Sequence, residues 1–299
     1  MIVNIPSESD FLETGLSLLD FAWDVGAGLL TDLDQAQYFG TTEPEMTSEF
    51  WQAAKRRLMV GCLVAQQAVE FILKSRIAAV SPFLLVAGNP QEWPRDSASA
   101  DTPFADFRMI DAQDLVRAHD ASADNRLDQS FVQKFDELRK RRNAIMHTVD
   151  VRLDVQVADV MGDILFVYRH LFPNRAWVAV RREYLERSPL AQLHSTDFVE
   201  ERLVWEFHLV SGLLTSRQMS DYFGLPAQPR KYICPNCLLA IDSDLEPRTG
   251  VLRPNKPTSA ALFCFVCGAE SSVQRRPCSH SDCRGNVISD DDRCLTCGR

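Results

Sequence analysis

One short stretch, RKRRNAIMH at residues 139–147, holds the side chains of this chain that are best suited to chemistry. Arg142 offers a permanently charged guanidinium, and His147 offers an imidazole that can give or take a proton near neutral pH. Asn143 follows Arg142 and can hydrogen-bond to either group or to a substrate. A fixed cation beside a titratable imidazole suits reactions at a phosphodiester, where negative charge grows on the phosphate.

The stretch ends a segment that is patterned as one helix, from about residue 128 to residue 147. Its apolar residues recur at helical spacing at Phe131, Phe135, Leu138 and Ile145. Arg142 lies inside this apolar stripe, and a buried charge without a partner is costly. We therefore expect Arg142 to face an anion or a water-lined cleft.

Helix geometry separates the two charged groups of the stretch. Arg142 and His147 are five residues apart, which is roughly 140° around an ideal helix. Both side chains reach one phosphate only if the helix ends or distorts near His147, or if a second chain completes the site. Asn143 and His147, four residues apart, share one face. The geometry favours a composite site in a dimer.

A structural explanation of the same residues is the alternative. Arg142 would then pair with Glu70 or Asp136 inside a helical bundle. His147 would be a helix-end residue whose charge the helix dipole favours.

Helical patterning continues through residues 1–224, which predicts an all-α bundle. A polar segment rich in glycine and proline, residues 86–106, is expected to be a surface insertion. Residues 225–231 contain two prolines and are predicted to be a linker. The apolar content falls beyond this point, where we predict two small modules, residues 232–270 and residues 271–299.

Within the helical part, two segments resemble a HEPN domain, the helical family common in prokaryotic toxin and phage-defence ribonucleases. Residues 66–74, QQAVEFILK, resemble the family's early helix with its Glu-x-x-x-Lys pair, here Glu70 and Lys74. Residues 142–147, RNAIMH, fit its Arg-x4–6-His motif. The resemblance covers about residues 47–171, and the flanking helices look like additions.

The resemblance implies RNA cleavage without a catalytic metal, by internal attack of a 2′-hydroxyl. His147 would act as general base or acid, Arg142 would stabilise the phosphate charge, and Asn143 would orient the phosphate or His147. The family's site usually forms where two copies of the motif face each other in a dimer. Glu70 and Lys74, four residues apart, suit a supporting salt bridge better than a catalytic pair.

Cysteines are concentrated at the end of the chain. Eight of the nine follow residue 230, at Cys234, Cys237, Cys264, Cys267, Cys278, Cys283, Cys294 and Cys297. Three of the four pairs have C-x-x-C spacing, and Cys278 and Cys283 are separated by four residues. Such clustered pairs in a cytosolic chain are typical of tetrahedral Zn²⁺ sites. We expect two structural zinc ions, each with four cysteine ligands in sequential order. A cross-braced pairing, and His280 in place of Cys278 or Cys283, are the alternatives.

Composition sets the compartment and the partners that we expect. The first residues lack the basic start and apolar run of a signal peptide, and the longest apolar region is interrupted by charges, so we expect a cytoplasmic protein without a membrane span. The expected partners are RNA, a second copy of the chain and an antitoxin or defence-system protein. The alternative function is a non-catalytic dimerisation scaffold whose zinc modules bind nucleic acid or a protein.

Overall fold

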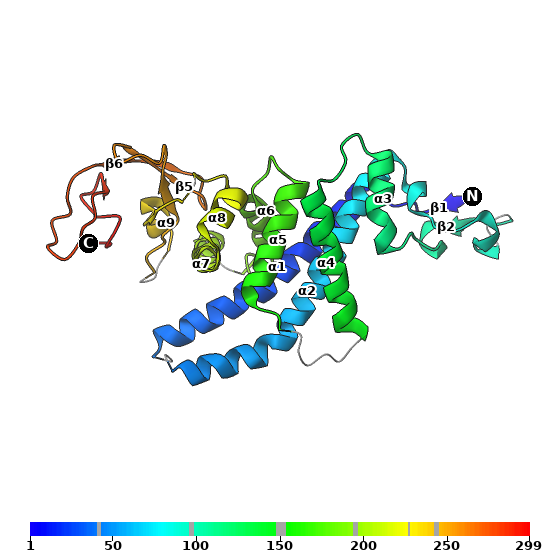
Figure 1. The fold of residues 1–299 in the computed structure, drawn as a ribbon, viewed down its shortest axis with the longest axis horizontal. Coiled ribbons are helices and arrows are strands. Elements are labelled where there is room, and N and C mark those ends of the chain that lie inside the picture. The colour runs from blue at the N-terminus through cyan, green and yellow to red at the C-terminus, as the bar shows by residue number, and fades with distance from the viewer. Residues whose placement is uncertain (41–42, 96–98, 148–153, 194–196, 227, 242–244) are drawn as a thin grey trace. The chain divides into compact units, whose positions relative to one another are not determined.

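The computed structural model describes residues 1–40, 43–95, 99–147, 154–193, 197–226, 228–241 and 245–299 (Figure 1). Helices dominate the described chain up to residue 223, as the sequence predicts. They are α1 (Glu8–Tyr38), α2 (Pro44–Val80), α3 (Ala112–Ser122), α4 (Gln129–His147), α5 (Val157–Leu171), α6 (Trp177–Glu186), α7 (Asp197–Leu213) and α8 (Ser216–Phe223). A short helix α9 (Pro235–Leu239) follows in the cysteine-rich region.

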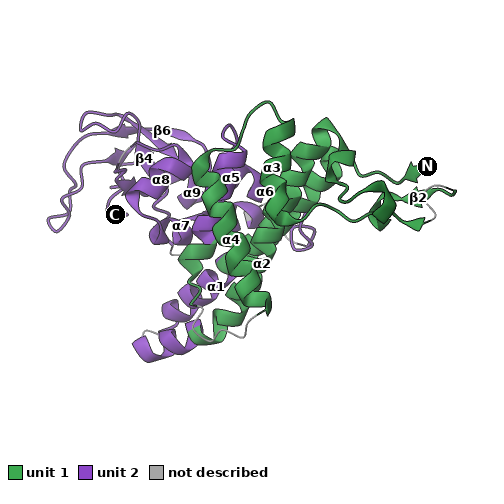
Figure 2. Ribbon diagram, turned by 45° about the vertical axis from the view of Figure 1, so that its right-hand side comes forward, with its two compact units in different colours: residues 1–26, 52–160 green, residues 27–51, 161–299 purple. Residues whose placement is uncertain are grey.

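The chain forms two compact units, coloured separately in Figure 2. The first contains residues 1–26 and 52–160, and the second contains residues 27–51 and 161–299. Helices α1 and α2 therefore contribute to both units. The first unit is smaller than the predicted helical domain, because the helices from residue 161 onward cluster with the cysteine-rich region.

Close helix packing builds the core of the first unit. A Cβ atom on Gly15 of α1 would lie 2.7 Å from the Ile72 side chain and 3.1 Å from the Ala68 carbonyl oxygen of α2. Only glycine fits at this crossing. A Cβ atom on Gly61 of α2 would lie 3.5 Å from the Val25 side chain and 3.6 Å from the Val160 side chain. Apolar positions at helical spacing thus bring α1, α2 and the residues just before Met161 together.

The segment expected to be a surface insertion contributes to this core. It contains the 3₁₀ turns Pro90–Glu92 and Phe104–Asp106 and strand β2 (Thr102–Pro103), which pairs in parallel with β1 (Ile2–Val3), and it follows the 3₁₀ turn Pro82–Leu85. Phe104 is almost fully buried, and the Trp93 ring lies 5.4 Å from the ring of Phe107, which directly follows the segment and is also buried. Its glycines and prolines correctly predict turns, but its aromatic residues anchor it.

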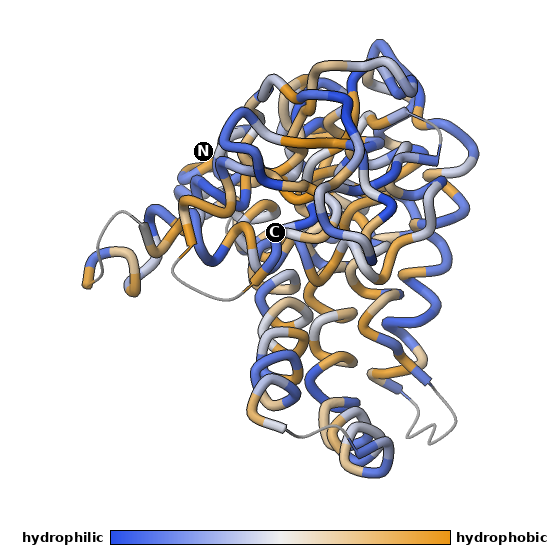
Figure 3. The backbone as a smooth tube through the Cα atoms, turned by 90° about the vertical axis from the view of Figure 1, so that its left-hand side faces the viewer, coloured by the Kyte–Doolittle hydropathy of each residue, from blue (hydrophilic) through white to orange (hydrophobic). Residues whose placement is uncertain are grey.

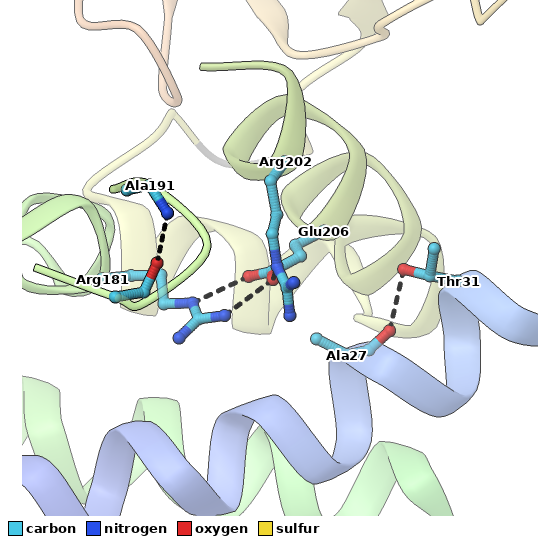
Figure 4. A network of polar contacts seen from close by, with 7 residues as sticks. Ala27, Thr31, Arg181, Ala191, Arg202 and Glu206 are labelled. Atoms are coloured by element: carbon cyan, nitrogen blue, oxygen red, sulfur yellow. Dashed lines mark hydrogen bonds and ion pairs between the residues drawn. The ribbon is translucent and has the colours of Figure 1, made fainter. Parts of the chain in front are cut away.

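A buried ion-pair network joins α6 and α7 in the second unit (Figure 4). Arg181 donates to both carboxylate oxygens of Glu206, at 2.9 and 2.8 Å, and both side chains are buried. Arg202 donates to the same carboxylate at 2.8 Å. Burial alone would raise the pKa of Glu206, but hydrogen bonds and charges from Arg181 and Arg202 outweigh burial and lower that pKa.

The end of the helical pattern, before residue 224, is divided between two helices, α7 and α8. Thr215 begins α8 with a capping box, in which its hydroxyl accepts from the Gln218 backbone and the Gln218 side chain accepts from the Thr215 backbone. Gly224 ends α8 in the left-handed region at φ 62°. A local cap therefore overrides the apolar periodicity that runs through residue 214.

Strands of the cysteine-rich region form one continuous antiparallel sheet in the order β3-β4-β5-β6-β7. The strands are β3 (Lys231–Tyr232), β4 (Gly250–Leu252), β5 (Ala261–Cys264), β6 (Glu270–Gln274) and β7 (Ile288–Ser289). The predicted boundary between residues 270 and 271 lies inside β6, which pairs with β5 on one side and β7 on the other. Ile233 and Leu295, both fully buried, belong to one shared apolar core. The two modules are therefore parts of one folded region.

The predicted linker is partly structured and tied to the helices. Leu225 is buried and its backbone nitrogen donates to the Ser220 carbonyl. Lys231, at the end of the predicted linker, donates from Nζ to the carbonyl oxygen of Ser211 in α7 at 3.0 Å. Phe223 of α8 lies 4.9 Å from Phe265 of the cysteine-rich region. The region packs against α7 and α8.

Among the described helices, α2 alone is long and apolar enough to pass a membrane-span test, with a mean hydropathy of 1.3 over an 18-residue window. Of this window, 61% is buried within the chain, a pattern that core helices share. Figure 3 shows hydrophobic and hydrophilic segments alternating along the long helices, which is the pattern of amphipathic packing.

Candidate functional site

The N-cap and the buried face of helix α4 position its run of basic residues, Arg139 to Arg142. Asp128 caps the helix by accepting from the Phe131 backbone nitrogen at 2.8 Å. Phe131, Phe135 and Leu138 are buried, which fixes the rotation of α4 in the first unit. The apolar stripe predicted from the sequence is thereby confirmed over these three residues.

The four consecutive cations of α4 have different surroundings. Arg139 and Lys140 both pair with Asp136, at 2.7 and 2.6 Å, and these contacts lower the pKa of the Asp136 carboxyl, Lys140 more than Arg139. Arg141 donates to the Cys62 sulfur across 4.0 Å. Arg142 donates to the side-chain oxygen of Asn143 at 3.1 Å. In the part of the chain that the structure describes, Arg142 makes no ion pair with a carboxylate.

Arg142 and Asn143 line an open pocket of about 240 Å³. Its other lining residues are Glu70, Asp111, Ala112, Gln113 and Arg139. A partly buried guanidinium in such a pocket is a ready site for an anion. Asp111 and Gln113 were not predicted as site residues, because nothing in their local sequence indicates that the start of α3 lies against α4; Arg139 belongs to the basic stretch but was not assigned a role in the site.

Glu70 lies at this pocket, but Lys74 does not. Glu70 is 9% exposed and accepts from the Gln66 side-chain nitrogen at 2.6 Å. The Lys74 ammonium instead lies 5.3 Å from the centre of the Phe71 ring. The expected Glu70–Lys74 salt bridge is therefore not formed among the described contacts, since each side chain has another neighbour.

His147 is the last residue of α4 and is exposed. It is not among the residues that line the Arg142 pocket. The structure thus brings Glu70, Arg142 and Asn143 together and leaves His147 apart from them. The angle expected between positions five residues apart on a helix accounts for the separation of His147 from Arg142. Asn143 lines the pocket although it lies only four residues before His147.

Eight cysteines form two groups of four in sequential order. The first group is Cys234, Cys237, Cys264 and Cys267, and the second is Cys278, Cys283, Cys294 and Cys297. Within each group all four sulfurs lie within 4.8 Å of one another, and His280 belongs to neither group. The sequential grouping predicted from the spacing is confirmed, and cross-braced pairing is excluded.

The sulfur separations are compatible with one metal ion in each group. Four sulfurs at about 2.3 Å from one ion lie about 3.8 Å from each other. The observed separations are 3.8 Å for Cys234–Cys267, 3.5 Å for Cys237–Cys264, 3.8 Å for Cys278–Cys297 and 3.9 Å for Cys283–Cys294. A disulfide requires about 2.05 Å. Each group can hold one structural metal ion.

Backbone and hydroxyl groups prepare the sulfurs for a metal. In the first group, the N–H groups of Val266 and Cys267 both donate to the Cys264 sulfur at 3.4 Å. In the second, burial opposes ionisation, but the N–H groups of Thr296 and Cys297 lower the pKa of Cys294 to about 7. Such donors favour the thiolate, which is the form that binds metal.

Two supporting residues of the cysteine groups carry no signal in the sequence. Thr249 is fully buried, and its hydroxyl lies 3.2 Å from the Cys264 sulfur and 3.6 Å from the Cys237 sulfur. A Cβ atom on Gly285 would lie 2.8 Å from the Cys294 sulfur and 2.7 Å from the Thr296 Cβ. Neither residue stands in a cysteine motif, so only the fold places it at the site.

In comparisons with known proteins, no family model, no curated protein and no solved structure matches this chain.

Proposed function

We propose that this protein is a metal-independent endoribonuclease of the toxin or anti-phage type, active in the cytoplasm as a homodimer. The observation that carries the proposal is the Arg142–Asn143 pair in an open pocket, with Arg142 unpaired by any described carboxylate. RNA supplies a phosphate for this cation and, in its 2′-hydroxyl, its own nucleophile. The resemblance of residues 66–74 and 142–147 to HEPN ribonucleases supports the same reaction.

In the proposed reaction, the 2′-oxygen attacks the adjacent phosphorus, a bond to that oxygen forms, and the bond to the 5′-oxygen breaks. The products are a 2′,3′-cyclic phosphate and a 5′-hydroxyl. The His147 of the second chain takes the proton of the 2′-hydroxyl, and a water molecule gives a proton to the leaving 5′-oxygen. Arg142 stabilises the phosphate charge, and Asn143 holds Arg142. Each acid or base contributes about 10²–10⁴ in rate.

A dimer supplies what one chain lacks in this scheme. His147 lies outside the pocket that holds Arg142, so a second copy would bring its own His147 to that pocket. No catalytic metal is needed for attack by a 2′-hydroxyl. The two cysteine groups would hold structural Zn²⁺ and assist in recognising RNA, an antitoxin or a defence-system partner.

The test is cleavage of RNA in the presence of EDTA by the purified, zinc-loaded protein. We expect cleavage to products with 2′,3′-cyclic phosphate ends. Arg142→Ala and His147→Ala should each lower the rate by at least about a hundredfold, since each removes a charge-stabilising or proton-transferring group.

Arg56→Ala is the control, because Arg56 is an exposed basic residue of α2 that does not line the pocket. It should change the rate by less than about threefold. Cleavage that survives both Arg142→Ala and His147→Ala would refute the assignment.

A non-catalytic scaffold is the second candidate. It is favoured by the firm attachment of the cysteine-rich region to α7, through Lys231–Ser211 and a backbone hydrogen bond of Arg248 to the His208 ring at 3.2 Å. In that case the protein would bind RNA or a protein partner without cutting RNA, and both substitutions would leave the cellular phenotype unchanged.

A further inference from the structure

A second pocket adjoins the Arg142 pocket in the first unit. It has a volume of about 320 Å³ and lies between α3 and α4. Gln113 and Arg139 line both pockets, so the two cavities share a wall. Together they form one groove along α4 from Val132 to Arg142, a distance of about 15 Å at the helical rise per residue.

The second pocket has an apolar side and a cationic side. Val116, Val132 and Phe135 supply the apolar side. Arg117 supplies the cationic side; it is exposed and has no hydrogen bond or ion pair with any described residue. The pocket therefore suits a ligand with a flat apolar ring and a negative group, at the lower end of the roughly 300–1,000 Å³ typical of small-ligand sites.

Nearby acidic charge does not oppose an anion here. Asp136 lines the pocket, but its carboxylate contacts Arg139 and Lys140 at 2.7 and 2.6 Å. Two cations thus offset one anion at the wall of the pocket, and Arg117 adds a third positive charge.

We propose that this second pocket binds the base and the phosphate of a nucleotide neighbouring the cleaved bond in single-stranded RNA. The base would lie against Val116 and Val132, and the phosphate would contact Arg117. Gln113, at the shared wall, has an amide that can read the edge of that base. This assignment rests on the proposed ribonuclease function, and it makes the pocket the place where the enzyme distinguishes one RNA sequence from another.

The test uses a fluorescent oligoribonucleotide carrying 2′-O-methyl groups, which block the attacking oxygen, bound to the zinc-loaded protein at several salt concentrations. Arg117→Ala should weaken binding about three- to tenfold and reduce the slope of log affinity against log salt by about one, as expected for one lost phosphate contact. Arg56→Ala, an exposed arginine of α2 that lines neither pocket, should bind as the wild type does.

A pocket-filling variant tests the base. Val132→Phe should weaken binding about five- to fiftyfold, because the larger side chain would occupy the space that the base needs. Wild type should bind more weakly to an RNA that lacks the one base held by the pocket. Val132→Phe should bind that RNA and the complete RNA equally well. If Val132→Phe lowers the helical signal in circular dichroism, Val132→Ala replaces it in the test. This variant should change which bases the protein prefers at that position.

Two outcomes separate the pocket from the proposed function. Unchanged binding by both Arg117→Ala and the Val132 variants would overturn the pocket assignment, even if the protein cleaves RNA. Binding that depends on Arg117, by a protein that never cleaves unmodified RNA, would keep the pocket and refute the ribonuclease.

Discussion

Arg142 differs from the three cations before it in the same helix. Arg139 and Lys140 share Asp136, and Arg141 contacts the Cys62 sulfur. Among the described side chains, Arg142 donates to the neutral oxygen of Asn143. Its sequence position inside an apolar stripe indicated that it needs an anion, and the pocket beside it gives an anion room. A charge kept without a counter-ion in a folded chain is typical of a binding site.

Gly285 provides a prediction at the level of one atom. A methyl group there would meet the Cys294 sulfur at 2.8 Å and Thr296 at 2.7 Å, so Gly285→Ala should displace a ligand of the second cysteine group. We expect about two zinc ions per wild-type chain after mild chelation, and at most about one in the variant. Elemental analysis of purified protein measures both.

Gly212→Ala is the control, because a Cβ atom at Gly212 would have nothing within 4 Å. It should keep the wild-type metal content. Retention of both ions by Gly285→Ala would contradict the close approach to Cys294.

Helices α6 and α7 are joined by a carboxylate that should make stability depend on pH. The pKa of Glu206 lies below its ordinary value of 4.5 in the folded chain. Its contribution is therefore complete at pH values above 4.5 and is lost as the pH falls through the lower folded-state pKa. Glu206→Gln should cost about 3–5 kcal/mol at neutral pH, because Arg181 then stays buried without its counter-ion.

Urea denaturation of both proteins over a pH series measures this effect. The difference in unfolding free energy between wild type and Glu206→Gln should shrink in acid. Asp221→Asn, which removes the exposed Arg217–Asp221 pair of α8, should change stability by less than about 0.5 kcal/mol at any pH. A constant difference down to low pH would show that ionised Glu206 is not the stabilising species.

Local sequence patterns predicted the elements that are determined by interactions between residues close in the sequence. The stripe of Phe131, Phe135 and Leu138 predicted α4 nearly to its ends, and the pairing of the cysteines along the chain predicted both cysteine groups. The break before α8 also had a local signal, the capping residues Thr215 and Gln218, which a reading of apolar periodicity overlooks.

Long-range packing accounts for what the sequence did not reveal. Gln113 lies thirty residues before Asn143, and no periodicity indicates that both line one pocket. The sheet of the cysteine-rich region is similar: Ile233 donates its backbone N–H to the Leu295 carbonyl at 2.9 Å. This contact joins segments that the sequence assigned to separate modules.

At the scale of the whole molecule, the proposed composite site can be tested by complementation. Arg142→Ala and His147→Ala chains, each inactive alone, are unfolded, mixed and refolded together in the presence of zinc. Half of the dimers should be mixed, and one of their two sites would combine an intact Arg142 with an intact His147. Activity should return to about a quarter of the wild-type value.

Separate refolding of the same two variants, followed by mixing, is the control and should restore less activity if dimers exchange slowly. No recovery in the co-refolded sample, with dimers present by light scattering, would place Arg142 and His147 of one site in the same chain.

Strand β6 pairs with β5 on one side and with β7 on the other, and so connects the segments that hold the two cysteine groups. Hydrogen bonds of Lys231 and Arg248 attach the sheet to α7. The region should therefore melt as one cooperative body. A chelator or an oxidant that attacks the partly exposed thiols near the end of the chain would unfold the sheet and expose the side of α7 against which it packs. Loss of the metal or oxidation of the cysteines would therefore lower the stability of the helices in the second unit.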